Sequence, residues 1–212
     1  KRLTYSGTAI SVGTNTLTLS GGGGAWLVSG GLTLNDASSK IELGMGIIVD
    51  SVSTSVDNSL GLHVREGNAT VSSLLVSNIT PVAIDLGKSL YGAITVTNNG
   101  SLKLTKTGTL LASVSMSGGT LEADDSLTVT GALTHTGNIT IDVADTKTLT
   151  YSGTAISLGA NTLTLTGGGS LVSGGLTLND EDSKLLLNSI TVDSVSTSAD
   201  SSGLDIDADS TV

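Results

Sequence analysis

The sequence predicts an all-β fold, a parallel β-helix (β-solenoid) of about ten coils of roughly 21 residues, with no helices of consequence. Two observations predict this fold. The chain repeats itself, because Lys1–Gly24 returns as Lys147–Gly169 at an offset of 146 residues. In addition, short apolar alternations separated by Gly, Asn, Asp and Ser recur along the whole chain, without an apolar stripe of helical period.

The long repeat covers residues 1–71 and 147–212. Its second and third blocks, LVSGGLTLND and VDSVSTS, each occur twice, at Leu27–Asp36 and Leu171–Asp180 and at Val49–Ser55 and Val192–Ser198. Fixed-period similarity is typical of stacked units that bury their apolar faces on one another. No linker interrupts the pattern, so we expect residues 1–212 to form a single continuous β-solenoid.

Each coil is expected to begin with a strand whose alternate residues are aliphatic. The expected coil starts are Thr16, Lys40, Leu60, Pro81, Ser101, Thr120, Ile139, Thr162 and Lys184. The expected inward stack, in coil order, is Leu17/Leu19, Ile41/Leu43, Leu62/Val64, Ile84/Leu86, Leu102/Leu104, Ile139/Ile141, Leu163/Leu165, Leu185/Leu187 and Leu204/Ile206. At ~4.8 Å per coil the chain would form a rod on the order of 50 Å long.

The amino-acid composition indicates what kind of core the chain can build and which partners are unsuited to it. Aromatic residues make up 2% of the chain and Phe is missing, so the core must consist of thin aliphatic layers. The net charge of −10 argues against nucleic acid as a partner, and no apolar run is long enough for membrane insertion. The chain has no Cys, which excludes disulfides and thiolate chemistry. It begins Lys1-Arg2 without Met, so we expect a processed or excised segment.

A second strand in each coil is expected to present threonine outward, which we call the threonine rank. Its members are Thr33, Thr70, Thr95, Thr128, Thr150, Thr177, Thr191 and Thr211, with Ile48 as an interruption. The simplest interpretation is a solvated or packing surface, because Thr suits an exposed pleated face on which like charges would repel. Two hypotheses stay open beside it: ice binding by the Thr ladder, and lateral packing of one rod on another.

The remaining polar residues give weak indications of chemistry, and no catalytic or cofactor-binding residue is expected. His63 and His135 are separate in sequence and are interpreted as solvated. Asp124-Asp125 is similar to the adjacent aspartates of pectinolytic β-helix hydrolases, but no companion His or basic motif follows. The triplet Asp180, Glu181, Asp182 offers a weak possibility of Ca²⁺ binding, set against a solvated acidic turn.

Trp26 lies in a two-residue insertion that the second copy lacks; it either fills a gap in the core or presents an exposed ring for contact with a sugar or partner. The formal glycosylation acceptors are Asn68, Asn99 and Asn138, and chance matches are expected in a Thr-rich chain.

The phrases SGTAISLGANTLTLTGGG, LVSGGLTLND and ITVTNNGSLKLTKTG resemble the repeats of large bacterial surface proteins, namely autotransporter passenger regions and haemagglutinin-like adhesins. The resemblance covers the whole chain and implies a secreted or cell-surface β-solenoid that serves reach, stiffness, adhesion, or fibre or biofilm assembly. It transfers no site residue. The runner-up is an ice-binding protein, and the third hypothesis is a polysaccharide-active β-helix enzyme.

Open ends of a parallel solenoid expose unpaired backbone N–H and C=O groups. Because Thr211-Val212 matches Thr70-Val71, which lies inside the first copy, the sequence predicts that the ends of this chain abut further coils. Those coils would come from the same polypeptide or from other copies, end to end. Surface glycans and ice are the other partners considered.

Overall fold

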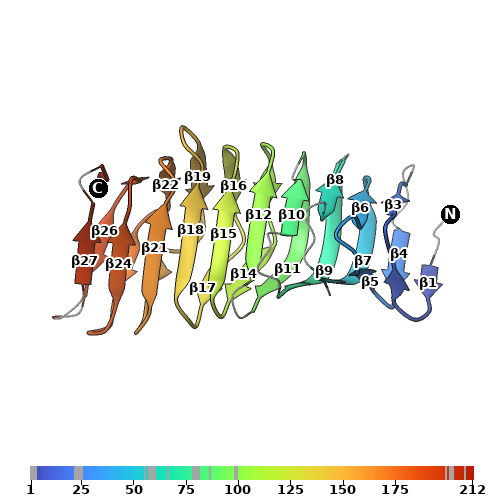
Figure 1. Cartoon of the computed structure of the whole chain (residues 1–212), viewed down its shortest axis with the longest axis horizontal. Coiled ribbons are helices and arrows are strands. Elements are labelled where there is room, and N and C mark those ends of the chain that lie inside the picture. The colour runs from blue at the N-terminus through green and yellow to red at the C-terminus, as the bar shows by residue number, and fades with distance from the viewer. Residues whose placement is uncertain are drawn as a thin grey trace.

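The computed structural model is a rod of stacked parallel β-coils, with the chain termini at opposite ends (Figure 1). It describes residues 4–21, 26–54, 56, 61–65, 67–77, 82–85, 87–97, 100–198, 200, 203–207 and 209–212. Within these ranges the chain forms strands and turns and no helix. The coils make about nine turns, about 21 residues apart. The prediction of an all-β parallel solenoid is therefore confirmed.

One side of the rod is a ten-stranded parallel sheet, which we call the long sheet, to which every coil gives one strand. Its strands are β3 (Thr16–Leu19), β6 (Lys40–Leu43), β8 (Leu62–Val64), β10 (Val82–Asp85), β12 (Ser101–Thr105), β15 (Gly119–Ala123), β18 (Ile139–Val143), β21 (Thr162–Thr166), β24 (Lys184–Leu187) and β27 (Gly203–Ile206). Seven of the nine expected coil starts lie at or within one residue of these strand starts. The other two, Leu60 and Pro81, lie outside the described residues.

A second, 14-stranded sheet, which we call the branched sheet, forms the rest of the wall with a short sheet. Its main path is β1 (Thr4–Ser6), β4 (Trp26–Ser29), β7 (Ile47–Thr54), β9 (Asn68–Val76), β11 (Ser89–Val96), β13 (Thr109–Leu110), β16 (Leu127–Val129), β19 (Thr148–Tyr151), β22 (Ser170–Val172) and β25 (Thr191–Val192). The remaining strands are β2 (Ile10–Ser11), β5 (Leu32–Leu34), β14 (Ser113–Met116), β17 (Leu133–His135), β20 (Ile156–Ser157), β23 (Leu176–Leu178) and β26 (Val195–Thr197).

Most coils therefore have three strands, not the two that the sequence suggested. β2 pairs with β5, and β5 pairs with the second half of β7; β20, β23 and β26 are the counterparts of these three segments in the second copy of the repeat. Together with β14 and β17 they make up a third side of the rod. The sequence reasoning missed this side because several of its strands have only two or three residues, too few to show alternation.

The three longest strands bend between two sides of the rod. In β7 and β9 the alternation is broken by two consecutive exposed residues, Asp50-Ser51 and Ser72-Ser73. In β11 the bend falls at Gly92, whose φ is +127°. A Cβ at Gly92 would lie 1.7 Å from the carbonyl oxygen of Val71. Only glycine therefore fits where the strands of these two neighbouring coils, which we call rungs, approach each other.

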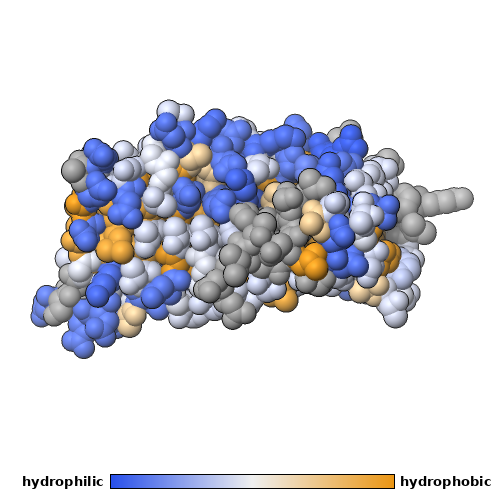
Figure 2. Space-filling view, in the orientation of Figure 1, coloured by the Kyte–Doolittle hydropathy of each residue, from blue (hydrophilic) through white to orange (hydrophobic). Residues whose placement is uncertain are grey.

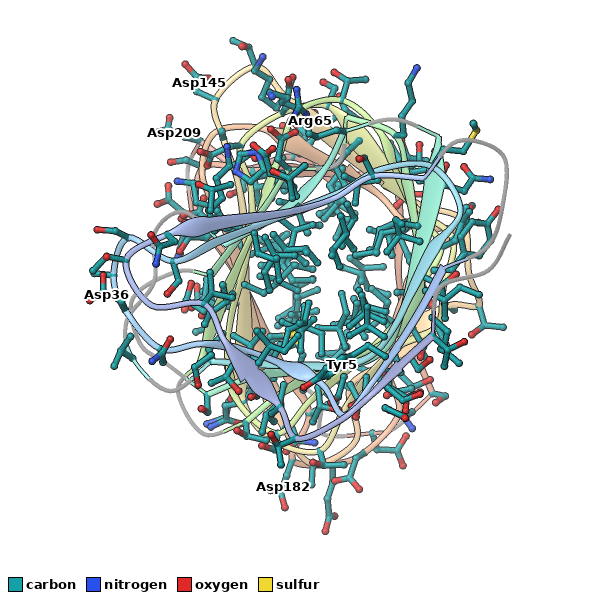
Figure 3. The ribbon with its side chains drawn as sticks, turned by 90° about the vertical axis from the view of Figure 1, so that its right-hand side faces the viewer. Tyr5, Asp36, Arg65, Asp145, Asp182 and Asp209 are labelled. Atoms are coloured by element: carbon teal, nitrogen blue, oxygen red, sulfur yellow. The ribbon has the colours of Figure 1, made fainter. Side chains whose placement is uncertain are left out.

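The core is a continuous column of aliphatic side chains, as the end-on view shows (Figure 3). Leu62 of β8 lies opposite Ile84 of β10, which lies opposite Leu104 of β12. The expected stack had set Ile84 beside Leu102, so it was displaced by two residues at this point. Since side chains alternate with a period of two, a displacement of two leaves every inward residue inward.

Tyr151 is an aromatic exception in the core. Its side chain is buried on the inward side of β19, and its hydroxyl accepts the backbone N–H of Leu133 at 3.1 Å. That bond satisfies a donor of β17, which pairs with β14 on one side only. The tyrosine hydroxyl therefore takes the place of a backbone acceptor at β17, between the branched sheet and the three-stranded sheet of β20, β23 and β26.

Replacing an inward leucine should cost far more stability than replacing its outward neighbour. We expect Leu165→Ala to lower the free energy of unfolding by about 2–5 kcal/mol, because it leaves a cavity in a column that cannot collapse sideways. The outward Thr164→Ala is the matched control and should change it by less than about 0.5 kcal/mol. Urea denaturation followed by circular dichroism measures both, and equal effects would contradict this core.

Candidate functional site

The threonine rank is divided between two sides of the rod. Its members on the main path of the branched sheet are Thr70, Thr128, Thr150, Thr191 and Thr211. Its members on the third side are Thr33 in β5, Thr95 in the second half of β11 and Thr177 in β23. The expectation of one rank on one strand is therefore corrected. It failed because β7, β9 and β11 bend from one side of the rod to another, so threonines before and after such a bend lie on different sides.

On the main path the threonines form short columns rather than one plane. Thr70 lies between Ile48 and Tyr91. Thr109, Thr128 and Thr150 form a column of three that ends at Val172. A shallow hollow of about 330 Å³ lies over this column, lined by Thr107, Gly108, Thr109, Ser126, Leu127, Thr128, Thr148 and Thr150.

Hydroxyls on the third side bond to one another along the rod. The hydroxyl oxygens of Thr33 and Ser53 lie 3.4 Å apart, and those of Thr177 and Ser196 lie 3.2 Å apart. No strand confined to this side carries Asp, Glu, Lys or Arg. Among the described strands outside the long sheet, Asp50 alone is charged. The third side is thus an uncharged surface of small hydroxylated side chains.

Charged side chains of the strands gather instead on the outer face of the long sheet, which we call the charged face. Glu42, His63 and Asp85 occupy successive rungs in register. A hollow of about 320 Å³ lies over them, lined by Lys40, Glu42, His63, Val64, Arg65, Asp85, Gly87 and Lys106. The end-on view shows Arg65 outside the ring of strands (Figure 3). This hollow holds three of the nine Lys and Arg residues of the chain and is the strongest candidate for a polar binding site.

The two carboxylates of the hollow are held by surrounding cations. Glu42 contacts Lys40 at 2.7 Å and Arg65 at 2.9 Å. Its hydrogen bond to Lys40, aided by that to Thr18 and by the charges of Lys40 and Arg65, lowers the pKa of Glu42 from 4.5 to about 2 against the effect of burial. Asp85 is buried beside His63, at 3.1 Å, and Lys106. The cations of this hollow are thus engaged by its own carboxylates.

His63 was expected to be solvated and to lack a carboxylate partner, and the structure corrects this. The neighbouring rung brings Asp85 to its Nδ1, although the two residues are far apart in sequence. Stacking of adjacent coils is the signal that could have found the pair, because residues about 21 apart share a column. No local motif carries that information.

A second charged group follows further along the same face. Lys103 contacts Asp124 at 2.8 Å and Glu122 at 3.5 Å, and the hydrogen bond from Lys103 to Asp124 raises the pKa of the lysine. Burial raises the pKa of Asp142, and the charges of Glu122 and Asp124 add to the effect. Each of these contacts joins neighbouring rungs.

Asp124 and Asp125, considered for their likeness to hydrolase aspartates, contact different lysines. Asp124 contacts Lys103 of the preceding rung, whereas Asp125 contacts Lys147 of the following rung at 3.2 Å. Asp125 also accepts the N–H of Ser126 at 2.8 Å, and this bond and the contact with Lys147 lower its pKa. The geometry agrees with the interpretation of this pair as a turn.

The acidic triplet forms a turn that recurs in the first copy. Asp180 accepts the N–H of Asp182 at 3.0 Å, and its own N–H donates to Ser183. In the first copy Asp36 accepts the N–H of Ser38 and donates to Ser39 in the same way, without an acidic triplet. Figure 3 shows Asp36 and Asp182 outside the ring of strands. Where the chain is described, no three ligating side chains gather closely enough to hold a metal ion.

The remaining histidine, the possible glycosylation sites and the tryptophan that the sequence analysis considered do not form a common site in the described residues. His135 is half-buried rather than solvated; its Nδ1 lies 3.1 Å from the carbonyl oxygen of Gly137, and its buried Nε2 has no hydrogen-bond partner. Asn138 is exposed and accepts the N–H of Thr162 at 2.8 Å, and Asn68 is exposed. The side chain of Trp26 and the whole of Asn99 lie outside the described residues.

No protein-family model matches the chain, and no curated protein or solved structure is significantly similar to it. In the described part of the chain, no helix is long and apolar enough to cross a membrane.

Glu42→Gln should destabilise the protein in a pH-dependent way. The folded pKa of about 2 is lower than the ordinary 4.5, so ionised Glu42 stabilises the folded state above pH 4.5 and loses that effect as the pH falls towards 2. The difference in unfolding free energy between wild type and variant should be largest at neutral pH and shrink through this window. Glu181→Gln, in an exposed turn, is the control, and a difference that stays constant with pH would contradict the assignment.

Ser183→Ala should lower the free energy of unfolding by about 1–3 kcal/mol, because the buried hydroxyl of Ser183 donates to the carbonyl oxygen of Gly159 and accepts the N–H of Asp180, and the variant loses both bonds. Ser39→Ala, at the equivalent position of the first copy, should behave alike. Ser157→Ala, on an exposed strand position, is the control. If all three variants unfold at the same urea concentration, the hydrogen bonds of the turn serines Ser183 and Ser39 do not stabilise the fold.

Proposed function

We propose that this chain is a structural, non-catalytic segment of an extracellular β-solenoid fibre or surface adhesin. The observation that carries the proposal is the direction of six of its ion pairs, which run along the rod from one strand of the long sheet to the next or between the turns beside them. Glu42–Arg65, Asp85–His63, Asp85–Lys106, Lys103–Glu122, Lys103–Asp124 and Lys147–Asp125 all join neighbouring rungs. Such contacts tie coils together, which is the requirement of a stiff rod.

The second copy of the repeat supports a scaffolding role for the charged face. Lys184, Leu186, Asp205 and Asp207 stand where the first copy has Lys40, Glu42, His63 and Arg65. The same coil thus folds with or without the ionic cluster. By contrast, the inward aliphatic residues and the serine turn are kept in both copies.

The two uncharged sides are suited to contact with uncharged material. They consist of small hydroxylated side chains with a few exposed apolar ones, such as Leu75, Tyr91 and Val172. These sides, rather than a pocket, would present the adhesive surface of a fibre or pack against a neighbouring rod. Surface glycans are the ligand class proposed for these hydroxyl-rich, weakly charged faces.

Ice binding and polysaccharide cleavage stay hypotheses without a specific observation in their favour. Ice binding needs a flat and regular hydroxyl array, and the threonine rank is split between two sides with columns of at most three threonines. The hypothesis predicts thermal hysteresis that Thr128 or Thr177 supports. An enzyme would need reactive groups that substrate can reach, whereas Glu42, Asp85 and Asp124 contact lysine, arginine or histidine within the fold.

Microscopy of the native material tests the proposal. Antibodies raised against this chain should label the surface of intact cells and decorate filaments or rods in negative stain. Labelling should disappear after brief protease treatment of intact cells, with a cytosolic protein as the control for lysis. Labelling only after lysis, or a compact soluble particle in place of an elongated one, would overturn it.

A further inference from the structure

The hollow on the charged face carries more positive than negative charge. Among the described residues that line it, the cations are Lys40, Arg65 and Lys106, and the carboxylates are Glu42 and Asp85. Glu42 is ionised at neutral pH, because its pKa is lowered to about 2. With the histidine left uncounted, the cations exceed the carboxylates by one, although the whole chain has a net charge of −10. Figure 2 shows hydrophilic side chains along the upper edge of the molecule, towards which the long-sheet strands of Figure 1 point.

Two of the cations come from rungs that are separated by a third. Arg65 follows β8 and Lys106 follows β12, and β10 lies between these two strands. The two outer rungs are therefore two strand spacings apart, roughly 10 Å. The middle rung has Gly87 at the position of Arg65, because Asp85 pairs with His63. A residue without a side chain leaves the space between the two cations open.

Both of these cations present donors to solvent. Arg65 bonds to Glu42 through Nη1 at 2.9 Å, and its side chain is 58% exposed. Lys106 contacts the buried Asp85, and its side chain is 66% exposed. A guanidinium has five N–H donors and an ammonium has three, so one carboxylate contact leaves each of them further donors. The carboxylates hold the two cations in position without using them up.

The fold does not require this cluster. In the second copy of the repeat, Leu186 and Asp207 stand where the first copy has Glu42 and Arg65. The strand pairings of β24 with its two neighbours nevertheless repeat those of β6. The cationic hollow is therefore an addition to one part of the rod, and its excess charge serves something other than the formation of the coil.

The charge and the lining of the hollow define a class of ligand. One excess positive charge, with donors on two sides, matches a singly charged carboxylate that accepts from both. The hollow measures about 320 Å³, whereas one water molecule takes about 30 Å³ of the liquid, so a bare ion would leave most of the space to solvent.

The molecule that carries the carboxylate should itself be polar. Val64 is the one apolar side chain among the described residues of the lining, and it is 1% exposed. An apolar or aromatic carrier would therefore bury little apolar surface against the protein. A carrier with several hydroxyl groups, by contrast, exchanges hydrogen bonds with the ammonium of Lys40 and the carboxylate of Glu42.

We propose that the hollow between Arg65 and Lys106 binds the carboxylate of an acidic sugar, such as a uronate unit of a surface glycan. Arg65 and Lys106 donate to the carboxylate oxygens, and the polar groups nearer to β6 bond to the sugar hydroxyls. This inference rests on the proposed surface role and deepens it, since it adds a charged ligand class to the uncharged glycans proposed for the hydroxyl-rich sides.

An NMR titration of the full 212-residue chain tests the site. The probes are methyl glucuronide and methyl glucoside, which differ only in that a carboxylate of the first is a hydroxymethyl group in the second. We expect methyl glucuronide to shift the amide signals of Arg65, Gly87 and Lys106 with a saturable dependence on concentration. Methyl glucoside should produce no saturable shift over the same range, because it lacks the group that the two cations recognise.

Arg65→Gln and Lys106→Gln should each weaken the binding of methyl glucuronide at least about fivefold, because each removes a charged donor. Lys184→Gln is the matched control. It removes the same charge at the position in the second copy that corresponds to Lys40, where the cluster is missing, and it should leave the affinity unchanged. The amide spectra also show whether each variant is folded.

Three results would overturn the site: no saturable shift with methyl glucuronide, equal shifts with both sugars, or equal losses of affinity in Lys184→Gln and the other two variants. Acetate is the third probe, and binding as tight as that of methyl glucuronide would assign the hollow to free carboxylates and overturn the sugar as ligand. These titrations use the purified chain and do not depend on where the native material is located. Failure of the sugar site and failure of the proposed function are therefore distinguishable.

Discussion

The parallel backbone ladder between rungs is the constraint on which the rest of the structure depends. It holds neighbouring coils about 4.8 Å apart in register, so every side chain lies beside the residue at the same position of the next rung. Inward positions must then be aliphatic and of similar width, which the column Leu62, Ile84, Leu104 satisfies. Corners need glycine where two backbones approach, as at Gly92.

The same constraint governs the outer surface. Like charges in register repel, and the rod uses hydroxyls or opposite charges along much of its axis, although Glu122 and Asp142 lie in register. The third side follows the first solution, and the charged face follows the second with Glu42, His63 and Asp85 and their lysine and arginine partners. The hydrogen bond to Lys40 and the other neighbours of Glu42 favour its charged form, which lowers its pKa. We interpret the ion pairs of the charged face as contacts that hold neighbouring rungs together.

The long repeat provides an internal comparison that a single copy could not. Equivalent residues occur once inside the rod and once near its end, and their burial differs because of the neighbouring rung alone. Tyr5 and Tyr151 show this at one end, and Leu204 and Leu62 show it at the other. Conversely, the ionic cluster around Glu42 is lost in the second copy while the serine turns at Ser39 and Ser183 are retained. The comparison indicates that the fold requires the serine turns, whereas the ionic cluster is a feature of one coil.

The sequence by itself determined the fold class, the coil length and the inward residues of the long sheet, because period-two alternation and a 21-residue spacing are local signals that stacking must respect. Only the tertiary structure decided which side of the rod each threonine faces, since the strands bend from one side to another at Asp50-Ser51 and Gly92. It alone also brought His63 to Asp85 and Leu133 to the hydroxyl of Tyr151. Contacts between rungs depend on register, and a shift of two residues leaves the pattern in the sequence unchanged.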